Sequence, residues 1–200
     1  MALPARLRDS LALILAGWSV LLLAAGCGGP QPLDWQAGAA AGLQTFQRHY
    51  FAGHTELAEA EFQRARTELA RTGRADLVAR AELVRCAVRA ASLEFDDCPR
   101  FEALRYGAGR EELAYADYLL GKGAHRTSDD AISRLVGAAV QLRRGGIDPS
   151  GVARAVDIAS EQGWRRPLLA WLGVQEKRAA DAGDSETAAR VRRRIELISG

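Results

Sequence analysis

The sequence predicts an all-α protein built of antiparallel helical hairpins, and three observations lead to this fold class. Apolar residues recur at helical spacing along much of the chain after Leu33, as they do from Ala131 to Val140. Ala, Leu, Arg and Glu, which favour helices, dominate this region, and alternating runs of β-branched and aromatic residues do not occur in it. Glycines interrupt the periodic stretches at intervals of about 12 to 20 residues, which is the spacing of short helices joined by tight turns.

These breaks place the helices in order along the chain. We expect helices at residues 33–52, 55–72, 75–94, 98–107, 110–121, 128–144, 149–162, 165–182 and 184–198. Glycines that tolerate the left-handed backbone of a helix C-terminus predict their ends: Gly53, Gly73, Gly107 to Gly109, Gly121, Gly145, Gly146, Gly163 and Gly183. Side chains that accept hydrogen bonds from free amides predict their starts: Thr55, Asp76, Ser128 with Asp129, Asp148 before Pro149, and Asp184.

The first 26 residues have the layout of an export signal. Arg6 and Arg8 precede an apolar segment that extends from Leu11 to Ala25. This segment is too short for a comfortable membrane span, which needs about 20 apolar residues, and no other apolar run in the chain approaches that length. We therefore expect residues 1–26 to be a cleaved signal peptide and the mature protein to have no transmembrane helix.

Small residues stand directly before Cys27 at the end of this apolar segment. Ala25 and Gly26 allow a narrow, extended backbone to reach a peptidase at the bilayer surface. The stretch resembles the bacterial lipobox, in which a signal peptidase cuts before a cysteine whose sulfur carries a diacylglyceryl group; the lipobox most often has Leu where this chain has Ala24. The resemblance implies that Cys27 is a lipidation site that carries acyl chains such as palmitate. The alternative is an ordinary secretory cleavage after Ala25 or Gly26, which would leave a soluble exported protein.

A short tether follows the cysteine. The glycines and prolines of residues 28–32 disfavour both a regular helix and a paired strand, so we expect an extended linker over residues 27–32. By resemblance to the sorting rule of enteric bacteria, Gly28 rather than Asp after the lipidated cysteine implies transfer to the outer membrane. The folded part, residues 33–200, would then face the periplasm close to that membrane.

The charges of the chain are nearly balanced. It has 27 Lys and Arg against 25 Asp and Glu, and loss of Arg6, Arg8 and Asp9 with the signal peptide leaves 25 against 24. Because a protein that binds phosphate backbones needs a basic field, we expect no nucleic-acid partner. With 48% apolar residues, the chain can build a sizeable core for one domain over residues 33–200.

One helical pair carries a repeat signature. Gly53 stands at the turn, and Ala58, Phe62 and Ala65 follow on the second helix, where small residues let the helices approach and the ring fills the gap to the next pair. This pattern resembles the tetratricopeptide repeat (TPR) over roughly residues 45–90, and hairpins without the signature follow. The resemblance implies a TPR-like α-solenoid that binds other proteins. An irregular helical bundle is the alternative architecture.

Cys86 and Cys98 are the two remaining cysteines, and an even pair in an exported chain indicates a disulfide. The segment from Phe95 to Asp97 would turn the chain so that Cys98, followed by Pro99, packs back against the helix of Cys86. A redox-catalytic pair is the alternative, but such enzymes generally have two cysteines separated by two residues. We therefore predict a structural disulfide.

The sequence contains no motif for cofactor binding or catalysis. It has no phosphate-binding glycine loop, nucleophile elbow or Rossmann fingerprint, and His49, His54 and His125 lack the spacing of a metal site. We therefore expect no enzymatic activity, no cofactor and no metal. The alternative class is a cell-wall ligand-binding protein or enzyme, with a cleft lined by acidic and aromatic residues: Glu111, Glu112 or Asp117 with Tyr115 and Tyr118.

The function we expect is that of a helical interaction scaffold, held at the outer membrane by the lipid on Cys27 and facing the periplasm. The anchor, the architecture and the lack of catalytic motifs support this interpretation together. We expect the partner to be another envelope protein, which contacts the first hairpins near Tyr50, Glu61 and Arg64. Small lipoproteins with TPR-like bodies serve bacterial assembly and secretion systems in this way, and the resemblance is one of class. A purely structural surface protein is the third interpretation.

Overall fold

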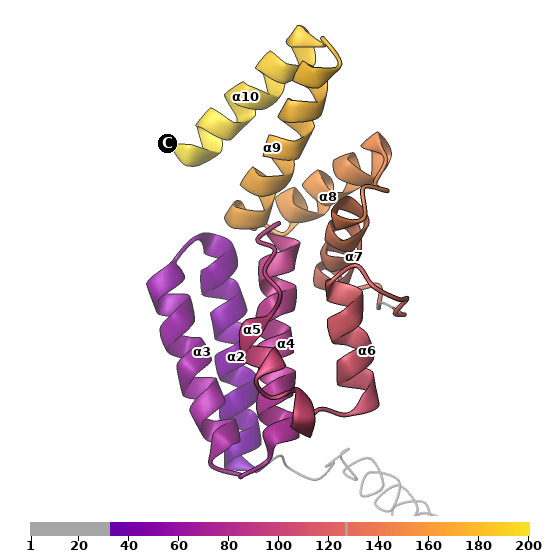
Figure 1. The fold of residues 1–200 in the computed structure, drawn as a ribbon. Helices are drawn as coiled ribbons and strands as arrows, with labels where there is room; N and C mark the ends of the chain where they lie inside the picture. Colours follow the sequence, from indigo (N-terminus) through magenta and orange to yellow (C-terminus); the bar gives the residue numbers. More distant parts are fainter. Residues whose placement is uncertain (1–32, 127) are drawn as a thin grey trace, which may run out of the picture. The chain divides into compact units, whose positions relative to one another are not determined.

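The computed structural model describes residues 33–126 and 128–200, and every regular element in these ranges is helical (Figure 1). The predicted all-α fold class is therefore confirmed for this part of the chain. The predicted signal peptide, the lipidation site Cys27 and the tether up to Pro32 lie outside the described residues. Residues 34–200 form one compact unit.

The first two described helices, α2 (Asp34–Ala52) and α3 (Thr55–Ala70), form an antiparallel hairpin. Gly53 connects them at a φ of +96°, a conformation that glycine adopts without strain. Gly42 of α2 faces α3 so closely that a Cβ atom built on it would lie 2.9 Å from the Cβ atom of Ala65. A pair of small residues therefore sets the separation of the two helices.

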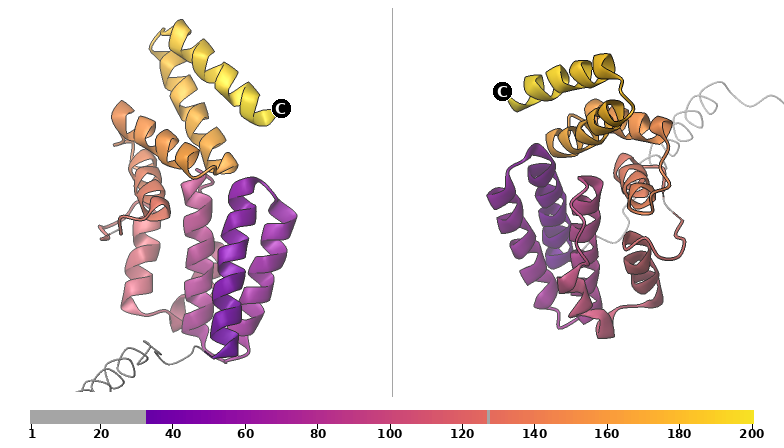
Figure 2. Two further views of the ribbon diagram at one scale, coloured as in Figure 1. Left: turned by 180° about the vertical axis from the view of Figure 1, so that it is seen from behind. Right: turned by 45° about the horizontal axis from the view of Figure 1, so that its top comes forward.

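Helix α4 (Ala75–Ala91) is the centre of the fold. It lies beside α2 and α3 in the ribbon views, and it also packs against α6 (Arg110–Leu119) and α7 (Ala131–Arg143) (Figure 1, Figure 2). Because alanines lie on several of its faces, other helices can approach it from more than one side. Most of its residues are consequently buried: Val78, Ala79, Ala81, Glu82, Leu83, Cys86, Ala87, Val88, Ala90 and Ala91.

The prediction of one continuous helix at residues 98–107 is wrong. The structure has a single helical turn, α5 (Pro99–Glu102), and then a 3-10 turn, η2 (Arg105–Gly107). Leu104 interrupts them with a φ of −110°. Phe101 is fully buried, and Cys98, the residue before α5, is tied to α4 by a disulfide. This tertiary anchoring overrides the helical propensity of so short a segment.

The C-terminal helices α8 (Pro149–Glu161), α9 (Arg165–Asp181) and α10 (Ser185–Ser199) follow in order, and each packs against its neighbour. Helix α9 also packs against α2. Outside residues 98–107, the predicted helix limits agree with the structure to within three residues. The hydrophobic period and the glycine breaks were therefore sufficient to place the helices along the chain.

Aspartates cap three of the helices. The carboxylates of Asp148 and Asp184 accept main-chain N–H bonds at the starts of α8 and α10, as predicted. The cap of α7 is Asp130, which accepts bonds from two main-chain amides, and the predicted cap at Ser128 and Asp129 is wrong by one or two positions. Sequence spacing alone does not distinguish three consecutive residues that are all able to cap.

The helices α3 and α4 start where predicted, but Thr55 and Asp76 are not their cap residues: both lie inside the first turns, after the N-caps His54 and Arg74. The hydroxyl of Thr55 accepts a bond from Arg166, and the carboxylate of Asp76 pairs with Arg74. Most of the glycines that were predicted to end helices have the expected positive φ: Gly53, Gly73, Gly121, Gly145, Gly163 and Gly183. Gly107 and Gly109 do not, which agrees with the absence of a regular helix end there.

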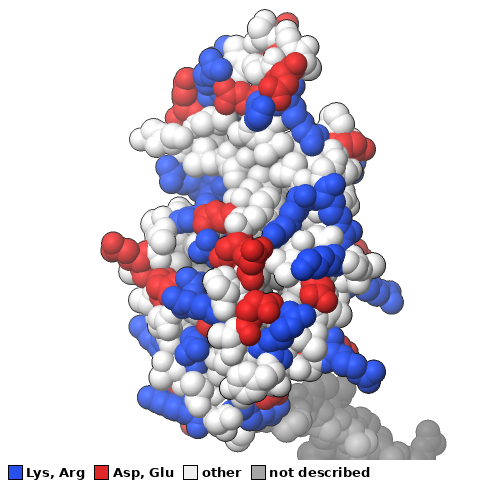
Figure 3. Space-filling view, viewed as in Figure 1, with Lys and Arg blue, Asp and Glu red and all other residues white. Residues whose placement is uncertain are grey.

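The core is built from aromatic and aliphatic side chains of several helices. The largest fully buried apolar side chains are Trp171, Phe46, Phe51, Phe62, Phe101, Leu135 and Leu172. Over the described residues, no helix has both the length and the apolar character that crossing a bilayer requires. Lys and Arg are interspersed with Asp and Glu over the face drawn in Figure 3, in keeping with the balanced composition.

Candidate functional site

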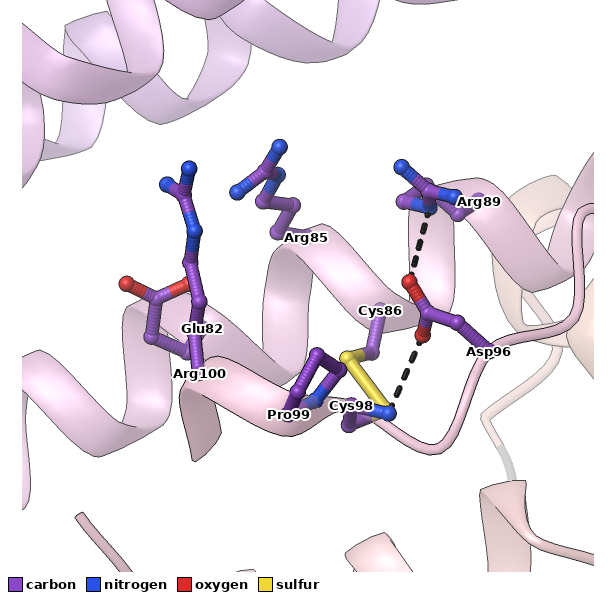
Figure 4. Close-up of a pocket in the computed structure, with 8 residues that line it drawn as sticks. All are labelled: Glu82, Arg85, Cys86, Arg89, Asp96, Cys98, Pro99 and Arg100. Atoms are coloured by element: carbon purple, nitrogen blue, oxygen red, sulfur yellow. Dashed lines mark hydrogen bonds and ion pairs between the residues drawn. A yellow bond between two sulfur atoms is a disulfide. The ribbon is translucent and has the colours of Figure 1, made fainter. Parts of the chain in front are cut away.

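A recess of about 220 Å³ lies between α4, α5 and the loop that joins them (Figure 4). Arg85 and Arg89 are four residues apart on α4, so they project from the same face of that helix. Arg100 of α5 approaches from the other element, and the three guanidinium groups lie on one side of the disulfide. The complete lining is Glu82, Arg85, Cys86, Arg89, Asp96, Cys98, Pro99 and Arg100.

The predicted disulfide between Cys86 and Cys98 forms the floor of this recess, with Cα atoms 5.8 Å apart. The chain returns to α4 through two non-glycine residues with left-handed backbone, Leu93 at a φ of 60° and Cys98 at a φ of 48°. The main-chain N–H of Cys98 donates to Asp96 Oδ1 at 3.0 Å. The cross-link and this hydrogen bond together hold Arg100 next to the arginines of α4.

Two arginines of the recess share one carboxylate. Arg85 Nη2 lies 2.9 Å from Glu59 Oε2, and Arg100 Nη1 lies 3.4 Å from Glu59 Oε1. Glu59 belongs to α3, so this carboxylate also joins the first hairpin to α4 and α5. The single negative charge of Glu59 is therefore paired with the positive charges of both Arg85 and Arg100.

The most deeply buried charge at the recess is Glu82, whose side chain is only 1% exposed. Arg66 Nε of α3 donates to its Oε1 at 2.8 Å. A buried carboxylate needs such a partner, because an unpaired charge in the interior is strongly destabilising. Glu82 and Arg66 therefore neutralise each other, and Glu82 forms a negatively charged wall of the recess.

Arg89 is incompletely paired. Its Nε lies 3.3 Å from Asp96 Oδ2 but is buried without a hydrogen bond. Its Nη2 lies 3.7 Å from Glu94, whose carboxylate is closer to Arg166, at 2.9 Å. Followed through Glu94 to Arg166, the ion pairs of the recess thus hold one more cation than anion, with five arginines and four carboxylates: Arg66, Arg85, Arg89, Arg100 and Arg166 with Glu59, Glu82, Glu94 and Asp96.

Of the residues expected to contact a partner, Tyr50 is only 5% exposed and lies in the core. The guanidinium carbon of Arg166 lies 4.2 Å from the centre of its ring. Burial and the nearby Glu94 carboxylate raise the pKa of the Tyr50 hydroxyl above its ordinary value. Tyr50 is therefore too buried to offer much surface to a partner. Its contact with Arg166 instead helps attach α9 to the first hairpin.

The other two expected contact residues pair with each other along α3. Arg64 Nη1 lies 3.1 Å from Glu61 Oε1, and the side chain of Arg64 is 69% exposed. Neither residue lines the recess. Arg64 is therefore accessible on the surface of the first hairpin, whereas the side chain of Glu61 is only 20% exposed.

The carboxylates of the alternative, enzymatic interpretation are not brought together with one another. Arg80 Nε donates to Glu112 Oε1 at 3.0 Å, and this bond lowers the pKa of the Glu112 carboxyl. Asp117 accepts a bond of 3.3 Å from Arg105, while Glu111 is exposed at the start of α6. A catalytic acid of a glycosidase needs a raised pKa, which is the opposite of the shift at Glu112.

Tyr115 and Tyr118 do meet, with ring centres 6.2 Å apart in a stacked arrangement. The ring of His125 lies 4.9 Å from Tyr115 and 5.6 Å from Tyr118. Burial raises the pKa of the Tyr115 hydroxyl to about 12. Two of these rings, those of Tyr115 and His125, border a second recess of about 340 Å³, which is lined by Tyr115, His125, Arg126, Ser128, Ser133 and Val136.

The sequence analysis did not identify Arg85, Arg89 and Arg100 as site residues. A usable signal exists, because an arginine precedes Cys86 directly and another follows Cys98 by two positions. Once the two cysteines are paired, these arginines must lie near each other. The spacing of Arg85 and Arg89 then places the third guanidinium on the same helical face.

The described residues thus define an all-α protein. Arginines line its recess, and the Cys86–Cys98 disulfide forms the floor. The chain matches no protein-family model, no curated protein and no solved structure.

Proposed function

We propose that this protein is a lipid-anchored helical scaffold, which holds a protein partner of the bacterial cell envelope on the periplasmic side of the outer membrane. The lipobox-like stretch before Cys27 supports the anchor. The TPR-like motif supports the class of scaffold, since Ala58, Phe62 and Ala65 are all buried between helices, as TPR-like packing requires. These observations favour a protein that binds another protein over one that performs chemistry.

The observation that carries the proposal is the shared carboxylate of Glu59. Arg85 and Arg100 lie at an open recess, yet a single carboxylate serves both. Arginine is enriched at protein interfaces and among the residues that contribute most to binding, because its planar guanidinium pairs with carboxylates in a defined geometry. An under-neutralised pair of arginines on a helical scaffold is therefore suited to contact a partner.

Affinity capture tests the proposal. The tagged, lipidated protein is isolated from gently solubilised envelopes, and a Cys27→Ser form that lacks the anchor is the matched control. We expect a stoichiometric envelope protein with the lipidated form and its loss with the control. A bait that captures no protein in either form would overturn the proposal.

A second candidate function is ligand binding at the cell wall, and the recess beside Tyr115 and His125 favours it. This recess combines aromatic rings with the hydroxyls of Ser128 and Ser133, and small-molecule sites generally combine apolar walls with a few polar groups in this way. Soluble cell-wall glycan fragments would be titrated against the wild type and a Tyr115→Ala form. Equal failure of both to bind would remove this candidate.

A further inference from the structure

We propose that the recess between α4 and α5 binds one carboxylate group, presented by an acidic segment of the protein partner, between Arg85 and Arg100. The inference rests on the proposed scaffold function and gives that function a specific chemistry. It identifies the kind of partner segment, an exposed Asp or Glu side chain, and the two side chains that hold it.

The charge balance of the recess supports a single negative charge. The ion pairs of the recess comprise five arginines and four carboxylates, and the excess arises where Glu59 is divided between Arg85 and Arg100. A guanidinium group has five N–H donors in a fixed plane, so each arginine can pair with Glu59 and still donate to a second oxygen. One further carboxylate would complete the pairing of both.

The surroundings of Arg85 strengthen such a bond. Its side chain is only 17% exposed, and its guanidinium carbon lies 5.2 Å from the ring centre of Phe62. An ion pair in a partly desolvated site is less screened by water than one on the open surface. The unbonded Nε of Arg89 adds a third positive group at the same recess.

The acidic walls of the recess select against more highly charged anions. Glu82 and Asp96 both line it, so a phosphate dianion would bring two negative charges towards two existing carboxylates. A carboxylate brings one charge and matches the excess of one cation. This reasoning favours an acidic peptide segment over free phosphate as the occupant.

Peptide titration of the full protein, purified in detergent, tests the inference. The probe is a fluorescein-labelled peptide with two glutamates between glycines, and the control peptide has glutamine in their place. We expect fluorescence anisotropy to show at least about tenfold weaker binding of the glutamine peptide, which corresponds to about 1.4 kcal/mol. We expect Arg85→Met and Arg100→Met each to weaken binding of the glutamate peptide by a similar factor.

Arg71→Met is the matched control variant, because Arg71 is a 69% exposed arginine at the C-terminal end of α3 that does not line the recess. It should leave peptide binding unchanged. Arg100 is 49% exposed, so Arg100→Met keeps the test decisive even where Arg85→Met fails to fold. Equal binding of the two peptides, or unchanged binding by Arg100→Met, would overturn the inference.

Inorganic phosphate is titrated separately as a competitor. Displacement of the glutamate peptide only by a large excess of phosphate agrees with the inference, whereas preferential binding of phosphate contradicts it.

Capture from envelopes distinguishes failure of the carboxylate site from failure of the scaffold function. A partner that is still retained by the Arg85→Met, Arg100→Met double variant would refute the carboxylate site and leave the scaffold intact.

Discussion

The indole N–H of Trp171 in α9 donates a hydrogen bond of 3.1 Å to the main-chain carbonyl of Ala91, the last residue of α4, across 80 residues of sequence. The last carbonyls of a helix have no partner within the helix, so this bond satisfies a group that would otherwise be buried unpaired. Trp171 is itself fully buried. The contact attaches the C-terminal helices to the central helix.

Replacing Trp171 by Phe is expected to lower the free energy of unfolding by about 1 to 3 kcal/mol, because the ring largely fills the space but the Ala91 carbonyl loses its donor. Urea unfolding measures the change. The control is Trp164→Phe, since Trp164 is partly exposed and packs on Phe51 with ring centres 4.6 Å apart. Equal losses in the two variants would contradict a specific role for the hydrogen bond.

The sequence was informative wherever structure is decided locally. Glycines at helix ends and apolar residues at helical spacing depend on a few neighbouring residues, and they placed most helices correctly. The segment after Cys98 was mispredicted because a disulfide and the burial of Phe101, rather than local preference, decide its path.

The position of Tyr50 could not be inferred locally either. It looks like a surface aromatic near a helix end, and it is buried only because α9 returns and Arg166 covers its ring. Arg166 pairs with Glu94, 72 residues earlier, and such a contact leaves no periodic trace in the sequence. The sharing of Glu59 by Arg85 and Arg100 leaves no such trace either, since Glu59 reaches the recess from another helix.

Two glycines of α2 provide a test of the close helix contact. Gly38 is exposed and has no atom within 4 Å of a built Cβ, so Gly38→Ala is expected to stabilise the protein by about 0.5 to 1 kcal/mol through the lower entropy of the unfolded chain. Gly42→Ala places its Cβ 2.9 Å from that of Ala65 and is expected to destabilise, because overpacking typically costs about 1 to 3 kcal/mol. Thermal unfolding compares them. Stabilisation of equal size by both substitutions would show that the helices do not need the small pair.

The disulfide is expected to contribute strongly to stability. It closes a loop with a sequence separation of 12, for which the chain-entropy model gives about 3 kcal/mol. Cys86→Ala combined with Cys98→Ala should therefore lower the free energy of unfolding by about this amount. A reducing agent should destabilise the wild type similarly and leave the double variant unaffected. A wild type that is insensitive to reduction would contradict the prediction.

The cap at Asp130 predicts a dependence of stability on pH. Hydrogen bonds from the hydroxyls of Ser128 and Ser133, and from main-chain amides at the start of α7, lower the pKa of this carboxyl to about 2. The bonds from the amides of Ile132 and Ser133 are both 3.0 Å long. Because the pKa of the folded protein lies below that of the unfolded chain, about 3.9, the ionised carboxylate stabilises the fold above that value, and this contribution is lost as the pH falls towards 2.

Asp130→Asn isolates this charge, because asparagine is also a good cap but does not ionise. The difference in free energy of unfolding between the wild type and this variant should be largest near neutral pH and should shrink between about pH 4 and about pH 2. Asp130 is exposed, so solvent screening keeps the difference modest. Ser133→Ala removes one hydroxyl donor, at 2.7 Å, and is expected to give an intermediate effect. Urea unfolding at a series of pH values measures all three proteins, and a difference that stays constant over this pH range would refute the assignment of the lowered pKa to Asp130.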